Sequence, residues 1–265
     1  MSRERARRGR ERTRRRREPA GPIWARPEPG SRRPRYSREQ IADAALAIAD
    51  AEGFEAVSMR RVASELRAGT MTLYHYVRTK DDLIALMDDA LMSELLIPDD
   101  ELPSDWREAL ALIARRSRAA FVRHPWAIDA MRAARLGPNG MRHFEQSVAA
   151  VSAIDLDPVE KLELVTMVDD YVFGYTIREP SPSREEAEAR AEWTRLAIDY
   201  IEEQLESGDF PHIRSLIPDG DVAAAFEMIE AAFTGEERFE RGLARLLDGI
   251  ELGLERRRVD AAETT

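Results

Sequence analysis

Hydroxyl, aromatic and basic side chains crowd the run TMTLYHYVRTK, which covers residues 70–80. Such side chains can hydrogen-bond to base edges and phosphate oxygens, and the methyl groups of Thr and Met can touch the methyl group of thymine. Leu73 and Val77 lie four residues apart and would face a core if the run is helical. The other side chains are then exposed. A helix with exposed aromatic side chains is poor packing material, so we expect it to contact a binding partner.

The residues before this run predict another short helix and a tight turn. Apolar side chains recur at helical spacing through residues 59–66, and Ser58 stands before them as an N-cap. Residues 67–69, Arg-Ala-Gly, then interrupt the pattern. Two short helices joined by such a turn indicate a helix-turn-helix, whose second helix enters the DNA major groove. A helical hairpin in a core is the alternative, but it does not explain two Tyr and a His exposed together.

Helices on either side would hold this motif. One begins at Ser37, where Gln40 completes a capping box. Another begins at Thr79, with Asp82 at the reciprocal capping position. Lys80 lies in the first turn of that helix, where free N–H groups and the helix dipole favour an anion. We therefore expect Lys80 to hold a DNA phosphate, and an ordinary exposed lysine is the alternative.

The blocks SMRRVASEL (58–66) and TMTLYHYVRTKDDL (70–83) resemble the DNA-binding domain of the TetR family of bacterial transcriptional repressors. The resemblance covers residues 36 to about 90. The chain from Trp106 onward is more loosely similar to the C-terminal regulatory domain of the tetracycline-repressor branch. One departure is Arg67, because the family usually has Gly there, and Gly adopts a left-handed turn most easily.

The resemblance implies which residues touch DNA. Those that it places at base edges are Thr70, Met71 and Thr72, with His75 beside them. Those that it assigns to phosphates are Arg61, Tyr74, Tyr76 and Lys80, and Arg60 would reach either a guanine or a phosphate. Phosphate contacts position a protein on DNA, whereas base contacts give it sequence specificity.

Charge and composition divide the chain into parts. Residues 1–35 hold 14 Arg and 4 Glu, whereas the whole chain carries a formal charge of −10. Many like charges with few large apolar side chains predict a disordered arm, which either touches phosphates or the minor groove or is a solubilising tail. We expect a helix-turn-helix domain over residues 36–83, a helical regulatory domain over residues 84–258 and a short tail over residues 259–265.

The residue patterns of two helices in the regulatory domain predict that these helices contact another subunit. The helix over residues 158–178 is apolar around most of its circumference, so it must be covered on several sides. The helix over residues 236–257 has an apolar stripe beside Gly242, Gly249 and Gly253, which indicate close approach of another backbone. We expect these helices to form a four-helix interface in a homodimer. Packing within one subunit is the alternative.

The regulatory domain is also expected to bind a small-molecule effector, whose identity the sequence does not give. The candidate pocket residues are Trp106, Phe121, Trp126, Met131, Phe144, Met167, Asp170, Tyr171 and Tyr175. Aromatic and Met side chains at helical spacing are more often core. Asp169 and Asp170 interrupt an apolar helix. Buried there, they would require a cationic ligand or an Arg partner, and a solvent-facing or inter-subunit pair is the alternative.

No metal or other cofactor is expected, because His124 and His143 are isolated and the magnesium ligands of tetracycline-binding members are not matched. The chain has no run of about 18 apolar residues and therefore no predicted membrane span. It also has no Cys, no Gly-rich phosphate loop and no nucleophile elbow, so we expect no enzyme.

The periodicity predicts an all-α protein of about nine to ten helices. The family resemblance implies that it regulates transcription, and the absence of Cys suits the cytoplasm. On the family resemblance it is a repressor that leaves a palindromic operator when its effector binds. A helical small-molecule-binding protein with a degenerate DNA-reading head is the alternative.

Overall fold

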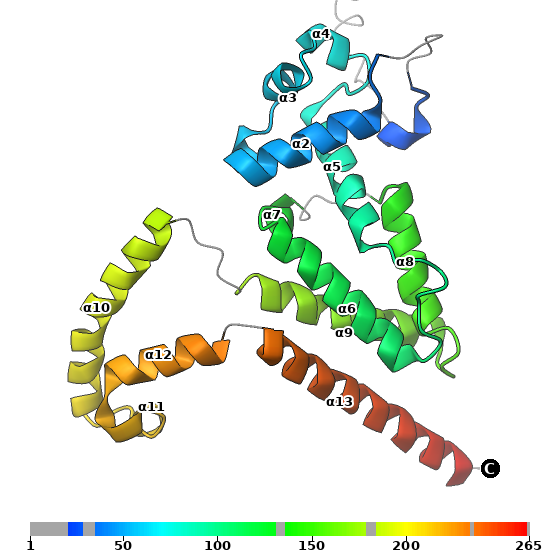
Figure 1. Cartoon of the computed structure of the whole chain (residues 1–265). Helices are drawn as coiled ribbons and strands as arrows, with labels where there is room; N and C mark the ends of the chain where they lie inside the picture. Colours follow the sequence, from blue (N-terminus) through cyan, green and yellow to red (C-terminus); the bar gives the residue numbers. More distant parts are fainter. Residues whose placement is uncertain (1–20, 29–34, 131–135, 179–183, 234–235, 264–265) are drawn as a thin grey trace, which may run out of the picture. The chain divides into compact units, whose positions relative to one another are not determined.

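The computed structural model describes residues 21–28, 35–130, 136–178, 184–233 and 236–263. Within those ranges the chain forms helices, turns and loops and no strand, which confirms the predicted all-α class. It divides into two compact units (Figure 1). The first contains residues 1–96 and 129–144, and the second contains residues 97–128 and 145–265. None of the described helices is long and apolar enough to cross a membrane.

The first unit is built on two helices that pack along each other, α2 (Arg38–Glu52) and α5 (Lys80–Leu95). Between them in sequence come η2 (Phe54–Ala56), α3 (Met59–Glu65) and α4 (Thr70–Leu73), with α3 against α4. η1 (Ile23–Ala25) and the start of α8 (Pro138–Ala150) complete this unit. Fully buried aliphatic side chains from several of these elements form its core, among them Ile23, Ile41, Ile48, Leu73, Leu83 and Leu91.

Capping side chains begin these helices where the sequence predicts. The Ser37 hydroxyl accepts from the Gln40 N–H in a full capping box, and the Ser58 hydroxyl accepts from the Arg61 N–H. Thr79 likewise accepts from the Asp82 N–H at 3.0 Å. The reciprocal bond predicted for Asp82 is different, because its carboxylate accepts from the Arg78 N–H, one residue before the cap.

The turn between α3 and α4 keeps its left-handed residue although no glycine stands there. Arg67 has φ of 50°, and the Ala68 N–H donates to the Ala63 carbonyl at 2.8 Å to close the turn. A side chain in this region costs about 1–2 kcal/mol relative to right-handed backbone. The departure at Arg67 therefore leaves the helix-turn-helix geometry in place.

The second unit begins with α6 (Trp106–Arg123) and continues through α9 (Pro158–Thr176) to α13 (Glu236–Glu263), with α9 packed against both α6 and α13. α9 begins with the predicted capping box of Asp157 and Glu160. α10 (Arg184–Glu206) packs with α11 (Pro211–Arg214) and α12 (Val222–Phe233), and η4 (Pro218–Gly220) joins the last two. The short α7 (Ala127–Ala130) crosses the division between the units.

The prediction that residues 1–35 are disordered is wrong for residues 22–28. That segment forms η1, and the Ile23 side chain is only 2% exposed. A large apolar pair, Ile23 and Trp24, stands within the Arg-rich sequence and gives it surface to bury. The remainder of the predicted arm, residues 1–20 and 29–34, lies outside the described residues.

Candidate nucleic-acid interface and regulatory region

The α4 helix presents polar and aromatic side chains to solvent because two residues anchor its other side. Leu73 and Val77 are fully buried, as predicted. Met71 is 74% exposed, Tyr74 is 42% exposed, and His75 is exposed as well. Thr70 and Thr72 are partly exposed on the same short helix. These five side chains together form an accessible surface of hydroxyl, aromatic and apolar groups.

Tyr76 does not share that surface, so the prediction that its side chain is exposed is wrong. It is only 8% exposed. α4 proper ends at Leu73, and the Tyr76 N–H donates to the Leu73 carbonyl at 2.9 Å in the turn that follows. That turn directs Tyr76 and Val77 together toward the core. A phosphate contact from Tyr76 therefore has little support.

The basic residues near α4 differ in how far their charge is already neutralised. The Arg61 guanidinium donates to Glu52 at 2.6 Å and to Glu65 at 2.9 Å, and these hydrogen bonds raise its pKa. Arg60 and Lys80 are exposed, and the Lys80 ammonium lies 5.9 Å from the centre of the Phe54 ring. Two carboxylates must release Arg61 before it can contact a phosphate, whereas Lys80 has no described ion pair.

The predicted ligand residues do not converge on one described pocket. Phe121, Trp126 and Tyr175 are buried, Trp106 and Tyr171 are partly buried, and Phe144, Met167 and Asp170 are exposed. Phe144 belongs to the first unit, whereas the others just named belong to the second. Met131 lies outside the described residues.

Tyr171 and Tyr175 take part in an aromatic cluster that joins α9 to the start of α13. Their rings lie 5.4 and 5.1 Å from the ring of Phe239, and the Tyr171 hydroxyl donates to the Phe239 carbonyl at 2.8 Å. The guanidiniums of Arg118 and Arg238 lie 5.6 and 4.8 Å from the centre of the Tyr175 ring. Because these rings contact one another, we assign them to packing within the subunit.

The acidic side chains with raised pKa values are not the one that the sequence analysis named as a ligand residue. Asp170 is exposed, and it is Asp169 whose pKa is raised, to about 6, by burial and then by the neighbouring Asp170 charge. On α5, Asp88 is 4% exposed, and no described donor reaches either of its oxygens. Burial, and then the charge of Asp89, raise the pKa of Asp88 to about 7. Two adjacent acids in an apolar stretch were the available sequence signal.

Two grooves border α13. One, of about 520 Å³, lies between α9 and α13 and is mainly apolar, with Leu164, Met167, Leu246, Ile250 and Leu254 in its lining. The other, of about 720 Å³, lies between α6 and α13. It is rich in charged groups, because Arg107 pairs with Asp248 and Glu251 and Arg115 pairs with Glu240 beside it. Among the described residues, no group of three or more His, Cys, Asp or Glu side chains could hold a metal ion.

The three glycines of α13 have different surroundings. A Cβ added at Gly242 would lie 2.3 Å from the Tyr171 hydroxyl, so this glycine admits a side chain of the same subunit. A Cβ added at Gly249 or Gly253 would meet no atom within 4 Å, and both glycines line the apolar groove. At Gly242 the close neighbour is thus a side chain of the same subunit. Gly249 and Gly253 instead lie on an open face.

Comparison with known proteins gives matches in both halves of the chain. Residues 41–87 match the family described as "Bacterial regulatory proteins, tetR family", and residues 98–254 match "Tetracyclin repressor-like, C-terminal domain". The HTH-type transcriptional repressor DrrR1 of Streptomyces coeruleorubidus is 35% identical over 91% of this chain and 87% of its own length. An HTH-type transcriptional regulator of Saccharopolyspora erythraea is 32% identical over 78% of this chain and 87% of its own.

A solved structure of similar fold is that of the TetR family protein ActR from Streptomyces coelicolor in complex with actinorhodin. It aligns with a TM-score of 0.64 at 26% identity, over 83% of this chain and 97% of ActR. The matched profiles cover most of the chain, including the exposed α4 surface and the regulatory helices. The chain belongs to the TetR family of bacterial regulatory proteins.

Proposed function

We propose that this protein is a dimeric repressor that binds a palindromic DNA operator through α4 and leaves it when a small molecule binds the second unit. As a member of its family it is a DNA-binding transcriptional regulator and not an enzyme. The observation that carries the proposal is α4 itself, where Met71, Tyr74 and His75 are exposed while Leu73 fixes the helix to the core. DNA operators lie in the bacterial cytoplasm, so we propose that location.

The side chains on the exposed face of α4 would contact the DNA bases. Thr70 and Thr72 can hydrogen-bond to base edges, Met71 can contact a thymine methyl group, and His75 lies beside them. Tyr74, Lys80 and Arg60 would contact the backbone at the edges of the groove, and Lys80 does so from the first turn of α5. Arg61 could join them only by exchanging Glu52 and Glu65 for a phosphate.

We assign the groove between α9 and α13 to dimerisation. Its lining is mainly apolar, Met167 is exposed, and Leu162 and Leu252 are exposed large apolar residues on the same two helices. Gly249 and Gly253 leave room for a partner helix at this face. Covering such a surface removes apolar area from water at about 25 cal/mol per Å². A twofold dimer would present two α4 helices to successive major grooves, about 34–36 Å apart.

Release of DNA requires an effector with different affinities for two arrangements of the dimer. Structural similarity to ActR, which was solved with actinorhodin bound, supports a small molecule as that effector. α8 begins in the first unit and ends in the second, and α5 ends at the division between them. We propose that an effector bound in the second unit acts on the spacing of the α4 helices through these two helices.

Selection of random duplex DNA on the purified protein tests the function. We expect an inverted repeat to be enriched, and we expect Tyr74→Ala to abolish the enrichment while Tyr200→Ala, another exposed tyrosine, retains it. Absence of enrichment by a folded wild-type dimer would instead favour a ligand-binding protein with a degenerate reading head.

Sedimentation tests the dimer. The chain has a mass of 30.1 kDa, so the dimer should sediment at twice this mass. Gly253→Leu should dissociate it, and Ala51→Leu, at an exposed position of α2 outside the proposed interface, is the control. A Gly253→Leu protein that remains dimeric would move the interface elsewhere.

A further inference from the structure

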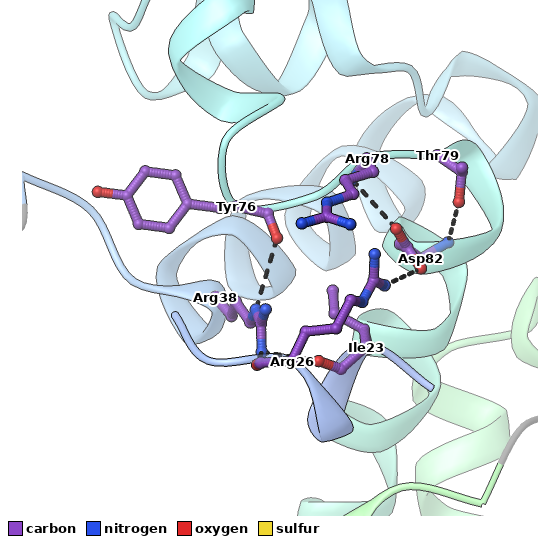
Figure 2. A network of polar contacts seen from close by, with 7 residues as sticks. All are labelled: Ile23, Arg26, Arg38, Tyr76, Arg78, Thr79 and Asp82. Carbon is purple, nitrogen blue, oxygen red and sulfur yellow. Dashed lines mark hydrogen bonds and ion pairs between the residues drawn. The ribbon is translucent and has the colours of Figure 1, made fainter. Parts of the chain in front are cut away.

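A short N-terminal segment, residues 22–28, packs on the first unit before its first long helix begins (Figure 2). Ile23 is buried. The Trp24 ring packs against Gly137, where an added Cβ would lie only 2.5 Å from it. The Arg38 guanidinium donates to the carbonyls of Ile23 and Arg26, both at 2.9 Å. Backbone, apolar and indole contacts thus fix the segment, which we name the strap.

The strap contributes two charged side chains to the first unit: Glu28 accepts from the Arg38 N–H at 3.3 Å, and Arg26 reaches α5. The Arg26 guanidinium forms an ion pair with the Asp82 carboxylate at the start of α5, and the two side chains are only 15% and 10% exposed. Asp82 also accepts from the Arg78 N–H at 3.1 Å. Burial alone would raise the pKa of Asp82, but the hydrogen bonds from Arg26 and Arg78 outweigh it and lower that pKa. The carboxylate is therefore ionised and held at neutral pH.

These contacts reach both ends of the loop that follows α4. At one end, the Arg38 Nε–H donates to the Tyr76 carbonyl at 3.4 Å, just after the recognition helix. At the other end, Asp82 holds Arg78, and Thr79 caps α5. Figure 2 shows Arg26 and Arg38 between the strap and this loop. The orientation of α4 depends on the loop, since α4 is a single turn of four residues.

We propose that the strap positions the recognition helix for base reading, with Arg26 and Arg38 as positioning residues that act through Asp82 and the Tyr76 carbonyl. The strap lies outside the residues matched by the family's DNA-binding profile, 41–87. The inference rests on the proposed DNA-binding function. It differs from a direct role of Arg26 on DNA, because the guanidinium is largely buried and its charge is already neutralised by Asp82.

The Arg-rich sequence before the strap must be separated from the strap in any test. Residues 1–20 contain 10 Arg and 3 Glu, and such charge strengthens binding to any DNA in a salt-dependent way. Deletion of residues 1–20 removes this charge and keeps the strap, whereas deletion of residues 1–28 removes both. Arg26→Ala removes only the ion pair, and Arg26→Lys restores a positive charge without the planar guanidinium.

We would measure the affinity of each deletion and substitution variant for the selected operator and for random duplex DNA of equal length, across a salt series. Arg26→Ala should weaken operator binding about tenfold, the scale of one lost base contact, with little change on random DNA and an unchanged salt slope. Arg26→Lys should recover part of the loss. The losses from Arg26→Ala and Asp82→Ala should be less than additive in the double variant, because the two residues share one ion pair, while Asp82→Ala also removes the bond to the Arg78 N–H. Arg142→Ala, at an exposed arginine of α8, is the control.

Equal weakening on both duplexes with a shallower salt slope would make Arg26 a phosphate contact and overturn the proposal. Unchanged affinities would overturn it as well, whether or not the melting temperature falls. Hydrogen exchange at residues 74–79 of the DNA-free protein gives an independent readout, and it should accelerate in Arg26→Ala but not after deletion of residues 1–20. Unchanged exchange there would refute the strap even if the wild-type protein selects no operator.

Discussion

Asp88 offers a test of how the first unit tolerates a buried acid. Both of its oxygens are buried without a described donor, and burial, together with the charge of Asp89, raises its pKa from an ordinary value of 3.8 to about 7. Between those two pH values the folded protein keeps a proton that the unfolded chain has released. Stability contributed at this position therefore falls as pH rises through that window. Asp88→Asn has nearly the same shape and does not titrate.

The size of the effect follows from the window. Each pH unit within it changes the free energy of unfolding by about 1.4 kcal/mol. Wild type should therefore lose about 2 kcal/mol relative to Asp88→Asn between pH 5 and pH 7, because the slope halves at the folded pKa, and the difference levels off above it. The amide, like the protonated carboxyl, still lacks a described partner, so the two proteins should be closest in stability at low pH.

Urea unfolding at fixed protein concentration, repeated from pH 5 to pH 8, measures this difference, and constant concentration removes the effect of dimer dissociation. Asp43→Asn, at an exposed acid of α2, is the control. A flat difference for Asp88→Asn would refute the reasoning. A difference that shrinks with rising pH would show that the carboxylate is ionised and paired in the folded protein.

Three further substitutions test other parts of the molecule. Lys80→Ala should lower the salt slope of operator binding by about one, and an unchanged slope would remove Lys80 from the phosphate contacts. Gly242→Ala places a Cβ 2.3 Å from the Tyr171 hydroxyl and should destabilise the protein by about 1–3 kcal/mol in thermal melting. Gly174→Ala is its control, and equal effects of the two would contradict the clash. Arg67→Gly relieves a φ of 50° and should stabilise the protein in urea by up to about 1 kcal/mol, so a loss would mean the side chain has its own role.

Local rules predict the helices of the reading head well. The Ser37 and Ser58 caps, the inward Leu73 and Val77, and the helix-turn-helix all follow from residues a few positions apart. Tyr76 is the exception, because α4 lasts only one turn and helical periodicity extended through residue 76 misplaces it. Short helices end where tertiary contacts end them, and these are not visible in a local pattern.

Long-range pairs are what the sequence conceals. Arg26 is one of 14 arginines in residues 1–35, and nothing local distinguishes it as the partner of an acid 56 positions away. The predicted pocket stays a prediction for a related reason. Tyr171 and Tyr175 have the spacing of a helix face, but whether that face meets a ligand or Phe239 depends on where α13 returns. Composition and periodicity identify a face, and they leave its occupant open.

The acids of α5 form long-range contacts that tie this helix to its neighbours. Asp89 accepts from the Asn139 and Gly140 N–H groups at 2.8 and 3.1 Å, so it caps the start of α8 from a different helix. A Cβ at Gly137 would lie 2.2 Å from Asp89, which leaves no slack in this contact. The first turn of α8 therefore cannot shift without breaking charge-assisted hydrogen bonds or carrying α5 with it. In its first turn, α5 is tied by Asp82 to Arg26. α5 thus carries one tie to the first turn of α8 and another to the strap, while Asp88 between these two ties has no described hydrogen-bond partner.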